Sequence, residues 1–389
     1  MSGTSAGLDW HLECSECGNR RGPEGVPTVC ECGRPWLVRY PQRSHPVTER
    51  ADVRRRFGMW RFRSFMPLAE GETPVTLGEG DTPLLPLPRL GTELDIDDLL
   101  VKDEALNPTG SFKARGLSAA ITRAAATGIR RFTLPTAGNA GVAAAAYGAR
   151  AGAEVRVFAP RQTPAVILSQ IAAFGGKLEL LDGHIGDCGK ASRAHASESG
   201  AVDLSTLREP YRIEGKKTLG FEICMQLGWS LPSVIVYPTG GGTGLIGMWK
   251  AFRELLDAGW VVGEPPRMVV VQAEGCAPIV RALQQGADVA EPWPDPSTVA
   301  SGLRVPAPLG DTLILRALRE SNGTAIAIAD HTLTAAAGYG TTQEGVDFCP
   351  EGGACIAAAS ALRQAGWIRK DDRVVVFNTG AGWLYRTPG

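Results

Sequence analysis

Valine-rich apolar segments that alternate with helical patterns restrict the fold of this chain more than any other feature. Three of them, at residues 233–237, 267–272 and 373–377, are apolar runs of strand length. A strand that is apolar on both faces is typical of a parallel sheet covered by helices on each side. The same alternation occurs earlier in the chain, where shorter strands are predicted at residues 132–135, 154–159 and 177–181. The pattern predicts an α/β fold with two mostly parallel sheets.

Chain length and charge narrow the class of protein. A chain of 389 residues exceeds the size at which one core stops growing, which predicts two domains and an appendage. A net charge of −1 provides no field that would attract nucleic acid or a membrane surface. No apolar run reaches membrane-spanning length, and residues 1–7 lack the parts of a signal peptide. We expect a cytosolic protein that acts on small molecules, without nucleic-acid or membrane partners.

Four of the nine cysteines form a pattern typical of a structural zinc ribbon. They are spaced as C-x2-C-x12-C-x-C, and a glycine follows the second cysteine of each pair. Four thiolates close a tetrahedral site and leave no position open for catalysis. The alternatives are two disulfides, which the cytosol disfavours, or a ribbon that has lost its metal. The predicted ligands are Cys14, Cys17, Cys30 and Cys32, with His11 as an unneeded further candidate.

Two other features are predicted to serve packing. The remaining cysteines are scattered, which is typical of small buried side chains; they are Cys188, Cys224, Cys276, Cys349 and Cys355. Residues 43–63 are basic and aromatic, and could be taken for a nucleic-acid patch. The run is short and the chain as a whole is not basic, so an arm that packs on a neighbouring surface is favoured.

Lys113 differs from other lysines because a turn precedes it and an alanine-rich helix follows it. Residues 107–110, Asn-Pro-Thr-Gly, have turn chemistry, and helical periodicity begins just after them. Lys113 would lie in the first helical turn, near the positive end of the helix dipole and near Arg115. Both neighbours disfavour the protonated amine, and the neutral amine is the form that attacks a carbonyl. An imine-forming lysine is therefore weighed against a solvated lysine on an amphipathic helix.

Small polar turns follow several of the predicted strands, at the sheet edge where ligands bind in such folds. Residues 136–141 include Asn139, a neutral donor that could bond a phenolate oxygen. Residues 239–244, Thr-Gly-Gly-Gly-Thr-Gly, could hold a phosphate with backbone N–H groups at a helix start. Thr379 follows the last strand, and residues 349–354 open another helix. Together with Lys113 they supply an imine-forming amine, a phosphate-binding loop, a donor for an oxygen and a hydroxyl. These are the groups that a site for pyridoxal phosphate requires.

A dinucleotide site is the competing interpretation of the same loop. Residues 242–247 satisfy G-x-G-x-x-G between a strand and a helix, and Glu274 ends the next strand. The fingerprint does not need the preceding Gly240 and Gly241, and it gives Lys113 no role. The pyridoxal-phosphate interpretation is therefore favoured.

In these motifs the chain resembles the fold-type II pyridoxal-phosphate enzymes, whose fold is like that of the tryptophan synthase β chain. The motifs are Ser-Phe-Lys at 111–113, Ala-Gly-Asn at 137–139, the loop at 240–244 and Thr-Gly at 379–380, in the family's order. Within the family the chain is most similar to threonine synthases, from about residue 79 to residue 382. The cysteine ribbon resembles one found on some bacterial relatives.

The resemblance implies a role for each matching residue. Lys113 would be the Schiff-base lysine and proton carrier, next to Phe112 in the cofactor site. Asn139 would bond the 3′-oxygen of the cofactor, and Thr379 would face its pyridine nitrogen. The cofactor phosphate would be held by Gly240, Gly241, Gly242, Thr243 and Gly244.

The implied reaction converts O-phospho-L-homoserine and water to L-threonine and phosphate. The substrate carboxylate would be held by the turn of Thr136, Ala137, Gly138 and Asn139 at a helix N-terminus. Arg212 resembles the family's phosphate-contacting arginine; the alternative is an interdomain ion pair. The resemblance further implies a homodimer. It also implies a ribbon-like segment at 1–42, a large cofactor-binding domain at 43–99 and 206–389, and a small mobile domain at 100–205.

Two departures from the threonine synthase pattern leave other functions open. Ala114 occupies a position that is often aspartate, and Thr136-Ala137 replaces a common Ser-Thr; the first spelling is shared with threonine and serine ammonia-lyases. One alternative is therefore β-elimination or β-replacement on another amino acid. Another is a binding protein that kept the fold without the chemistry and uses the ribbon for docking.

Overall fold

The computed structural model describes residues 8–41 and 43–386, and the chain divides into two units. Unit 1 comprises Met1–Gly80 and Lys113–Thr218, and unit 2 comprises Asp81–Phe112 and Leu219–Gly389. These bounds differ from the predicted domains, which remain a prediction about binding and movement. Residues 1–7, on which the cytosolic prediction partly rests, lie outside the described residues.

Unit 2 is built on a six-stranded sheet. Every neighbouring pair is parallel except the edge strand β4, which is antiparallel to β5. In spatial order the strands are β12 (Thr324–Ile328), β11 (Arg267–Ala273), β10 (Val234–Pro238), β13 (Arg373–Asn378), β5 (Asp98–Asp103) and β4 (Leu84–Pro86). The central strands are buried along nearly their whole length, as continuous apolar runs predict.

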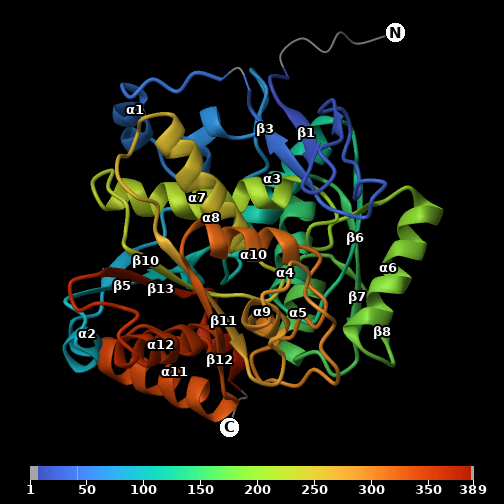
Figure 1. The fold of residues 1–389 in the computed structure, drawn as a ribbon. Coiled ribbons are helices and arrows are strands. Elements are labelled where there is room, and N and C mark those ends of the chain that lie inside the picture. The colour runs from blue at the N-terminus through green and yellow to red at the C-terminus, as the bar shows by residue number, and fades with distance from the viewer. Residues whose placement is uncertain (1–7, 42, 387–389) are drawn as a thin grey trace. The chain divides into compact units, whose positions relative to one another are not determined.

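Helices cover both faces of this sheet (Figure 1). The helix α8 (Thr243–Asp257) lies on one side, and α11 (Asp330–Glu344) and α12 (Pro350–Gln364) lie on the other. The shorter elements of the unit are α2 (Pro88–Leu94), α9 (Pro278–Gln284), α10 (Asp311–Glu320), η2 (Glu104–Leu106), η3 (Ser301–Leu303) and η4 (Gly382–Tyr385). The main core forms where α11 and α12 pack on the strands.

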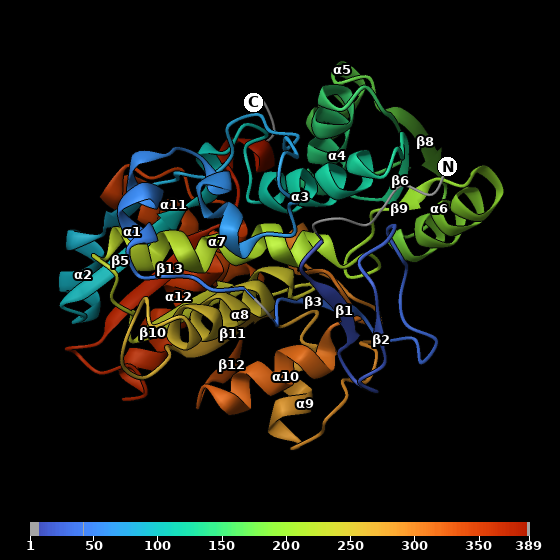
Figure 2. The same cartoon turned by 90° about the horizontal axis from the view of Figure 1, so that it is seen from above.

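Unit 1 contains a four-stranded, fully parallel sheet. Its spatial order is β8 (Lys177–Leu181), β7 (Glu154–Pro160), β6 (Arg131–Pro135) and β9 (Val202–Asp203). In both views, α6 (Ile185–Ser199) lies on one face, and α4 (Asn139–Arg150) and α5 (Ala165–Ala173) lie on the other (Figures 1 and 2). The predicted α/β class with two mostly parallel sheets is confirmed.

The rest of unit 1 is a small antiparallel ribbon, an arm and two long helices. The ribbon pairs β2 (Arg20–Arg21), β1 (His11–Cys14) and β3 (Trp36–Arg39) in that order. The arm carries α1 (Glu49–Arg55) and η1 (Met59–Phe65). The long helices are α3 (Lys113–Ala126) and α7 (Tyr211–Gln226), of which the part up to Thr218 belongs to this unit.

The arm packs as predicted. Phe62 and Phe65 are buried, and Met59 and Met66 form a small core with Ala119 of α3. Phe57 is 88% exposed, so the packing interpretation is confirmed for the part of the arm from Met59 to Met66, where the buried side chains lie.

No helix in the described part of the chain combines the length and the apolar character that a membrane crossing needs.

Candidate active site

The segment before Lys113 is held by backbone pairing to the end of the last strand of unit 2. The N–H of Phe112 donates to the carbonyl of Thr379 over 3.0 Å, and Ser111 forms a β-bridge with Gly380. Gly110 has φ +66°, a conformation that favours glycine in the turn. The helix α3 begins at Lys113, so the first-turn position predicted for this lysine is confirmed.

The predicted phosphate loop lies between β10 and α8, as the sequence indicated. Gly242 caps α8 at φ +78° and provides no side-chain cap, so the first N–H groups of the helix need acceptors from outside it. A Cβ at Gly240 would overlap the carbonyl oxygen of Gly302, and one at Gly244 would overlap the hydroxyl of Tyr237. The loop accepts only glycine at these two positions, and its chemistry suits an anion.

Thr379 lies beside the buried thiol of Cys349, and hydrogen bonds in this region join β5, α12 and β13 of unit 2. Its hydroxyl is 4.0 Å from the thiol of Cys349, and that sulfur caps α12 by accepting from the N–H of Gly352 over 3.3 Å. The side chain of Asn378 accepts from the N–H of Cys349 at 3.0 Å and donates to Asp103 at 2.9 Å. Burial raises the pKa of the Cys349 thiol above its usual range, so this group stays protonated.

Sequence reasoning placed Glu351 at the start of a helix but gave no role to it or to several other residues that support this half of the site. Tyr237 packs edge-on against Phe112, with ring centroids 6.2 Å apart, and against Phe377 at 4.9 Å. Glu351 accepts from the N–H of Gly302 over 2.8 Å and so fixes the loop that abuts Gly240. Strand-end position was a usable signal for Tyr237 and Asp103. Nothing in the sequence pattern indicated the contact that joins residues 302 and 351.

Unit 1 carries the second group of predicted site residues. Asn139 is the first residue of α4, and Gly138 precedes it without a side-chain cap. The hydroxyl of Thr136 donates to the carbonyl of Gly138 over 2.9 Å and accepts from the N–H groups of Gly138 and Gly141. Because this hydroxyl is committed to its own turn, a carboxylate bound here would depend mainly on backbone N–H groups.

Arg212 lies at the start of α7 and is buried, with a relative exposure of 2%. Its Nη1 donates to the carbonyl of Leu204 over 2.5 Å, while its Nε has no hydrogen-bond partner among the described residues. Burial lowers the pKa of Arg212, and the fields of Glu209 and Asp203, both in unit 1, act in the opposite direction.

Glu209 provides a pH-dependent test of this region. Its carboxylate accepts from the N–H of Tyr211 at 2.7 Å, and burial raises its pKa from 4.5 to about 7 against the opposing field of Arg212. Between pH 4.5 and about 7 the folded state holds a proton that the unfolded state has lost, so stability should fall as pH rises through this window. We expect the melting temperature of Glu209→Gln to change less over this range than that of the unaltered chain. Parallel melting curves against pH would contradict this.

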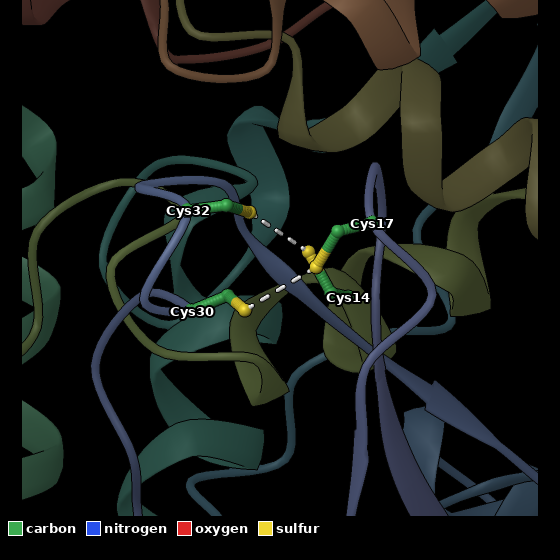
Figure 3. A group of neighbouring side chains, drawn as sticks. All are labelled: Cys14, Cys17, Cys30 and Cys32. Atoms are coloured by element: carbon green, nitrogen blue, oxygen red, sulfur yellow. Dashed lines mark hydrogen bonds between the residues drawn. The ribbon is translucent and has the colours of Figure 1, made fainter.

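The four predicted metal ligands are brought together in the ribbon (Figure 3). The four Sγ atoms lie within 4.8 Å of one another, with Cys14 and Cys32 at 3.4 Å and Cys17 and Cys30 at 3.7 Å. Tetrahedral zinc with sulfur at 2.3 Å requires separations of about 3.8 Å, so the donor set fits that ion. His11 is not a member of the group.

The electrostatics and backbone of the ribbon also suit a thiolate site. Burial opposes ionisation of Cys14, but backbone hydrogen bonds from Glu16 and Cys17 lower the pKa of its thiol to about 7. Gly18 and Gly33 have φ of +70° and +82°, as turns beneath the sulfurs require. The five scattered cysteines are all buried, as predicted for most of them, and Cys349 also caps α12.

Comparisons with known proteins agree with these features. A family model described as pyridoxal-phosphate dependent enzyme matches residues 75–380. The threonine synthase of Methanocaldococcus jannaschii is 33% identical over 372 residues, which cover 95% of this chain and 91% of the relative. The threonine synthase of Mycobacterium leprae is 36% identical over 322 residues, covering 82% and 86%. The solved structure of maize serine racemase shares the fold, with a TM-score of 0.68 at 22% identity, over 77% of this chain and 88% of that one.

Proposed function

Because this chain belongs to the family of pyridoxal-phosphate-dependent enzymes, we propose that it converts O-phospho-L-homoserine and water to L-threonine and phosphate. The observation that best supports this substrate is the buried guanidinium of Arg212, whose Nε has no hydrogen-bond partner among the described residues. A buried donor without an acceptor is unfavourable, and a substrate phosphate would provide the acceptor that this Nε lacks. The threonine synthases that are similar over most of the chain support this choice.

The residues present fit the cofactor. The glycine loop before α8 can accept the phosphate on backbone N–H groups, and its glycines leave no room for side chains. Thr379 offers a hydroxyl for the pyridine nitrogen, and Lys113 offers an amine for the carbonyl carbon. When bound, the cofactor supplies an electron sink for negative charge at the substrate Cα. A dinucleotide site is not needed to explain the loop.

Each residue of the chain then has a defined task. Lys113 would take the Cα proton on its Nζ, assist transfer of a Cβ proton, and return protons after water adds. Asn139 would orient the ring through its oxygen substituent. The backbone of residues 136–139 would hold the substrate carboxylate, and Arg212 would hold the phosphate until it leaves from Cγ.

A β-elimination or β-replacement on another amino acid is the second candidate. Ala114 and Ala137 favour it, because both replace polar residues that are common in threonine synthases. The structure adds that the Thr136 hydroxyl is already engaged in its own turn.

We further propose a cytosolic homodimer in which residues 100–205 move to close on the substrate.

One assay separates the two candidates. We expect phosphate release from O-phospho-L-homoserine by the enzyme loaded with cofactor, and little 2-oxo acid from L-threonine or L-serine. The opposite result would favour the ammonia-lyase-like alternative.

Arg212→Gln tests the phosphate contact. Removing the charge should raise KM for O-phospho-L-homoserine by about tenfold or more, since charge-assisted bonds are the stronger ones. Arg54→Gln is the control, because Arg54 is exposed. Equal KM values for the two variants would contradict a phosphate role for Arg212.

A further inference from the structure

The cysteine ribbon packs directly on the first turns of α7, the helix that carries Arg212. Tyr211, Glu214 and Lys217 follow one another at a spacing of three and are all buried on the side that meets the ribbon. The hydroxyl of Tyr211 donates to the carbonyl of Pro23 over 3.2 Å. The hydroxyl of Tyr40 donates to Glu214 over 2.6 Å. Two tyrosine hydroxyls therefore link the ribbon segment to this helix.

Stacked cations strengthen the same contact. The guanidinium of Arg123 lies 4.8 Å from the ring of Trp10 and 6.0 Å from that of Tyr211. The ammonium of Lys217 lies 4.6 Å from the ring of Tyr40 and donates to Glu214 over 2.6 Å. Trp10 and Tyr40 flank the paired strands β1 and β3 of the ribbon. A contact built from buried hydrogen bonds and cation–π pairs is stiff, because few of its groups can exchange partners with water.

The opposite side of α7 abuts the helix that begins at Lys113. A Cβ on Gly116 would lie 3.2 Å from the carbonyl oxygen of Arg212 and 3.0 Å from Cε of Lys216. A Cβ on Gly215 would overlap the carbonyl of Arg115. The two backbones approach closely at these glycines. The first turns of α7 are therefore held between the ribbon on one side and α3 on the other.

The four cysteines of the ribbon lie next to the loop whose Pro23 carbonyl accepts from Tyr211. Pro23 lies in the loop between Cys17 and Cys30, and the four thiols are the groups that would close this loop. The N–H of Arg212 itself donates to Glu209 at the helix start, so movement of Tyr211 would be passed to its neighbour through one peptide bond. Loss of metal would free the loop and remove the fixed acceptor for Tyr211.

We propose that the metal-loaded ribbon is a brace that positions Arg212 for an anionic ligand, with Tyr211 and Tyr40 as the positioning residues. The proposal rests on the phosphate role of Arg212 in the proposed function. The ribbon is thus an internal part of the substrate-binding unit, in contrast to an independent docking module.

The first test follows amide hydrogen exchange in the full chain with cofactor bound. Zinc-loaded protein is compared with protein stripped by a chelator under reducing conditions, and metal content is measured for both. We expect exchange at residues 209–217 to accelerate about tenfold or more on stripping. Unchanged exchange at these residues would overturn the brace, whatever the substrate is.

The second test measures the Kd for inorganic phosphate in the same two states. We expect stripping to raise this Kd about tenfold in the unaltered chain. Tyr211→Phe and Tyr40→Phe should each raise it about fivefold with zinc bound, and stripping should then add little. Tyr339→Phe is the matched control, since it removes an exposed hydroxyl that bonds Glu93 in unit 2.

Arg212→Gln separates failure of the inference from failure of the proposed function. If this variant binds phosphate as tightly as the unaltered chain, the phosphate role is wrong, and the exchange result still decides the brace. The other outcome is that the variant loses phosphate binding, while removal of zinc from the unaltered chain leaves its Kd for phosphate unchanged. In that case the inference is overturned and the proposed function stands.

Discussion

Lys113→Ala is expected to abolish turnover and to remove the visible absorption band of the lysine-bound cofactor. The lysine is assigned both the covalent attachment and the proton transfers, and loss of a positioned acid–base group alone costs about 10²- to 10⁴-fold. We therefore expect activity to fall by about 1,000-fold or more, measured as phosphate release. The absorbance spectrum provides a second readout that does not depend on the substrate.

Lys190→Ala is the matched control for this variant. Lys190 lies on α6 in the same unit and makes an exposed ion pair with Asp187 at 3.5 Å, so its removal should leave spectrum and activity unchanged. Retention of the band in Lys113→Ala would show that another amine holds the cofactor. A band that disappears together with activity would exclude the alternative of a binding protein without chemistry.

The central strands could be predicted because they are long, valine-rich and buried on both faces. The strand β12 was missed, since its Thr-Ala-Ile-Ala-Ile sequence is short and alanine-rich. It is a strand because it pairs in parallel with β11 at the edge of the sheet. This pairing is a tertiary effect, and the local sequence of β12 does not encode it.

The surface that buries the arm shows the same limit. Residues 43–80 group with residues 113–218. The reason is packing at long range, where Met59 and Met66 meet Ala119. Apolar character predicted that the arm would be buried, but it could not indicate which surface would bury it.

Within the candidate site, the turns at strand ends were predictable and their internal bonds were not. Glycine spacing identified the loop at 240–244. The groups that a Cβ would overlap there, the carbonyl oxygen of Gly302 at Gly240 and the hydroxyl of Tyr237 at Gly244, are known only from the structure. The hydroxyl of Thr136 is an instructive case, because sequence suggested a ligand contact and the structure shows it engaged within its own turn. The ribbon cysteines were found from spacing alone, because metal ligation is a local pattern.

Gly240→Ala is expected to weaken cofactor binding by about tenfold or more and to destabilise the fold. The added methyl would overlap the carbonyl oxygen of Gly302 and lie 2.9 Å from Val305. The obstructing atom is backbone, and Gly302 cannot retreat freely because its N–H is bonded to the buried Glu351. Overpacking of this kind costs about 1–3 kcal/mol. The phosphate loop would have to move instead, and its N–H groups would lose their common direction.

A matched alanine substitution isolates this effect from the general cost of losing a glycine. Gly338 lies in the exposed part of α11, where a Cβ meets nothing within 4 Å, so Gly338→Ala should stabilise the protein by about 0.5–1 kcal/mol. Its Kd for cofactor should equal that of the unaltered chain. Titration of cofactor into each protein, followed by thermal unfolding, measures both quantities. If Gly240→Ala binds cofactor as tightly as Gly338→Ala, the loop at 240–244 does not hold the phosphate, and the anion must be bound by another set of N–H groups.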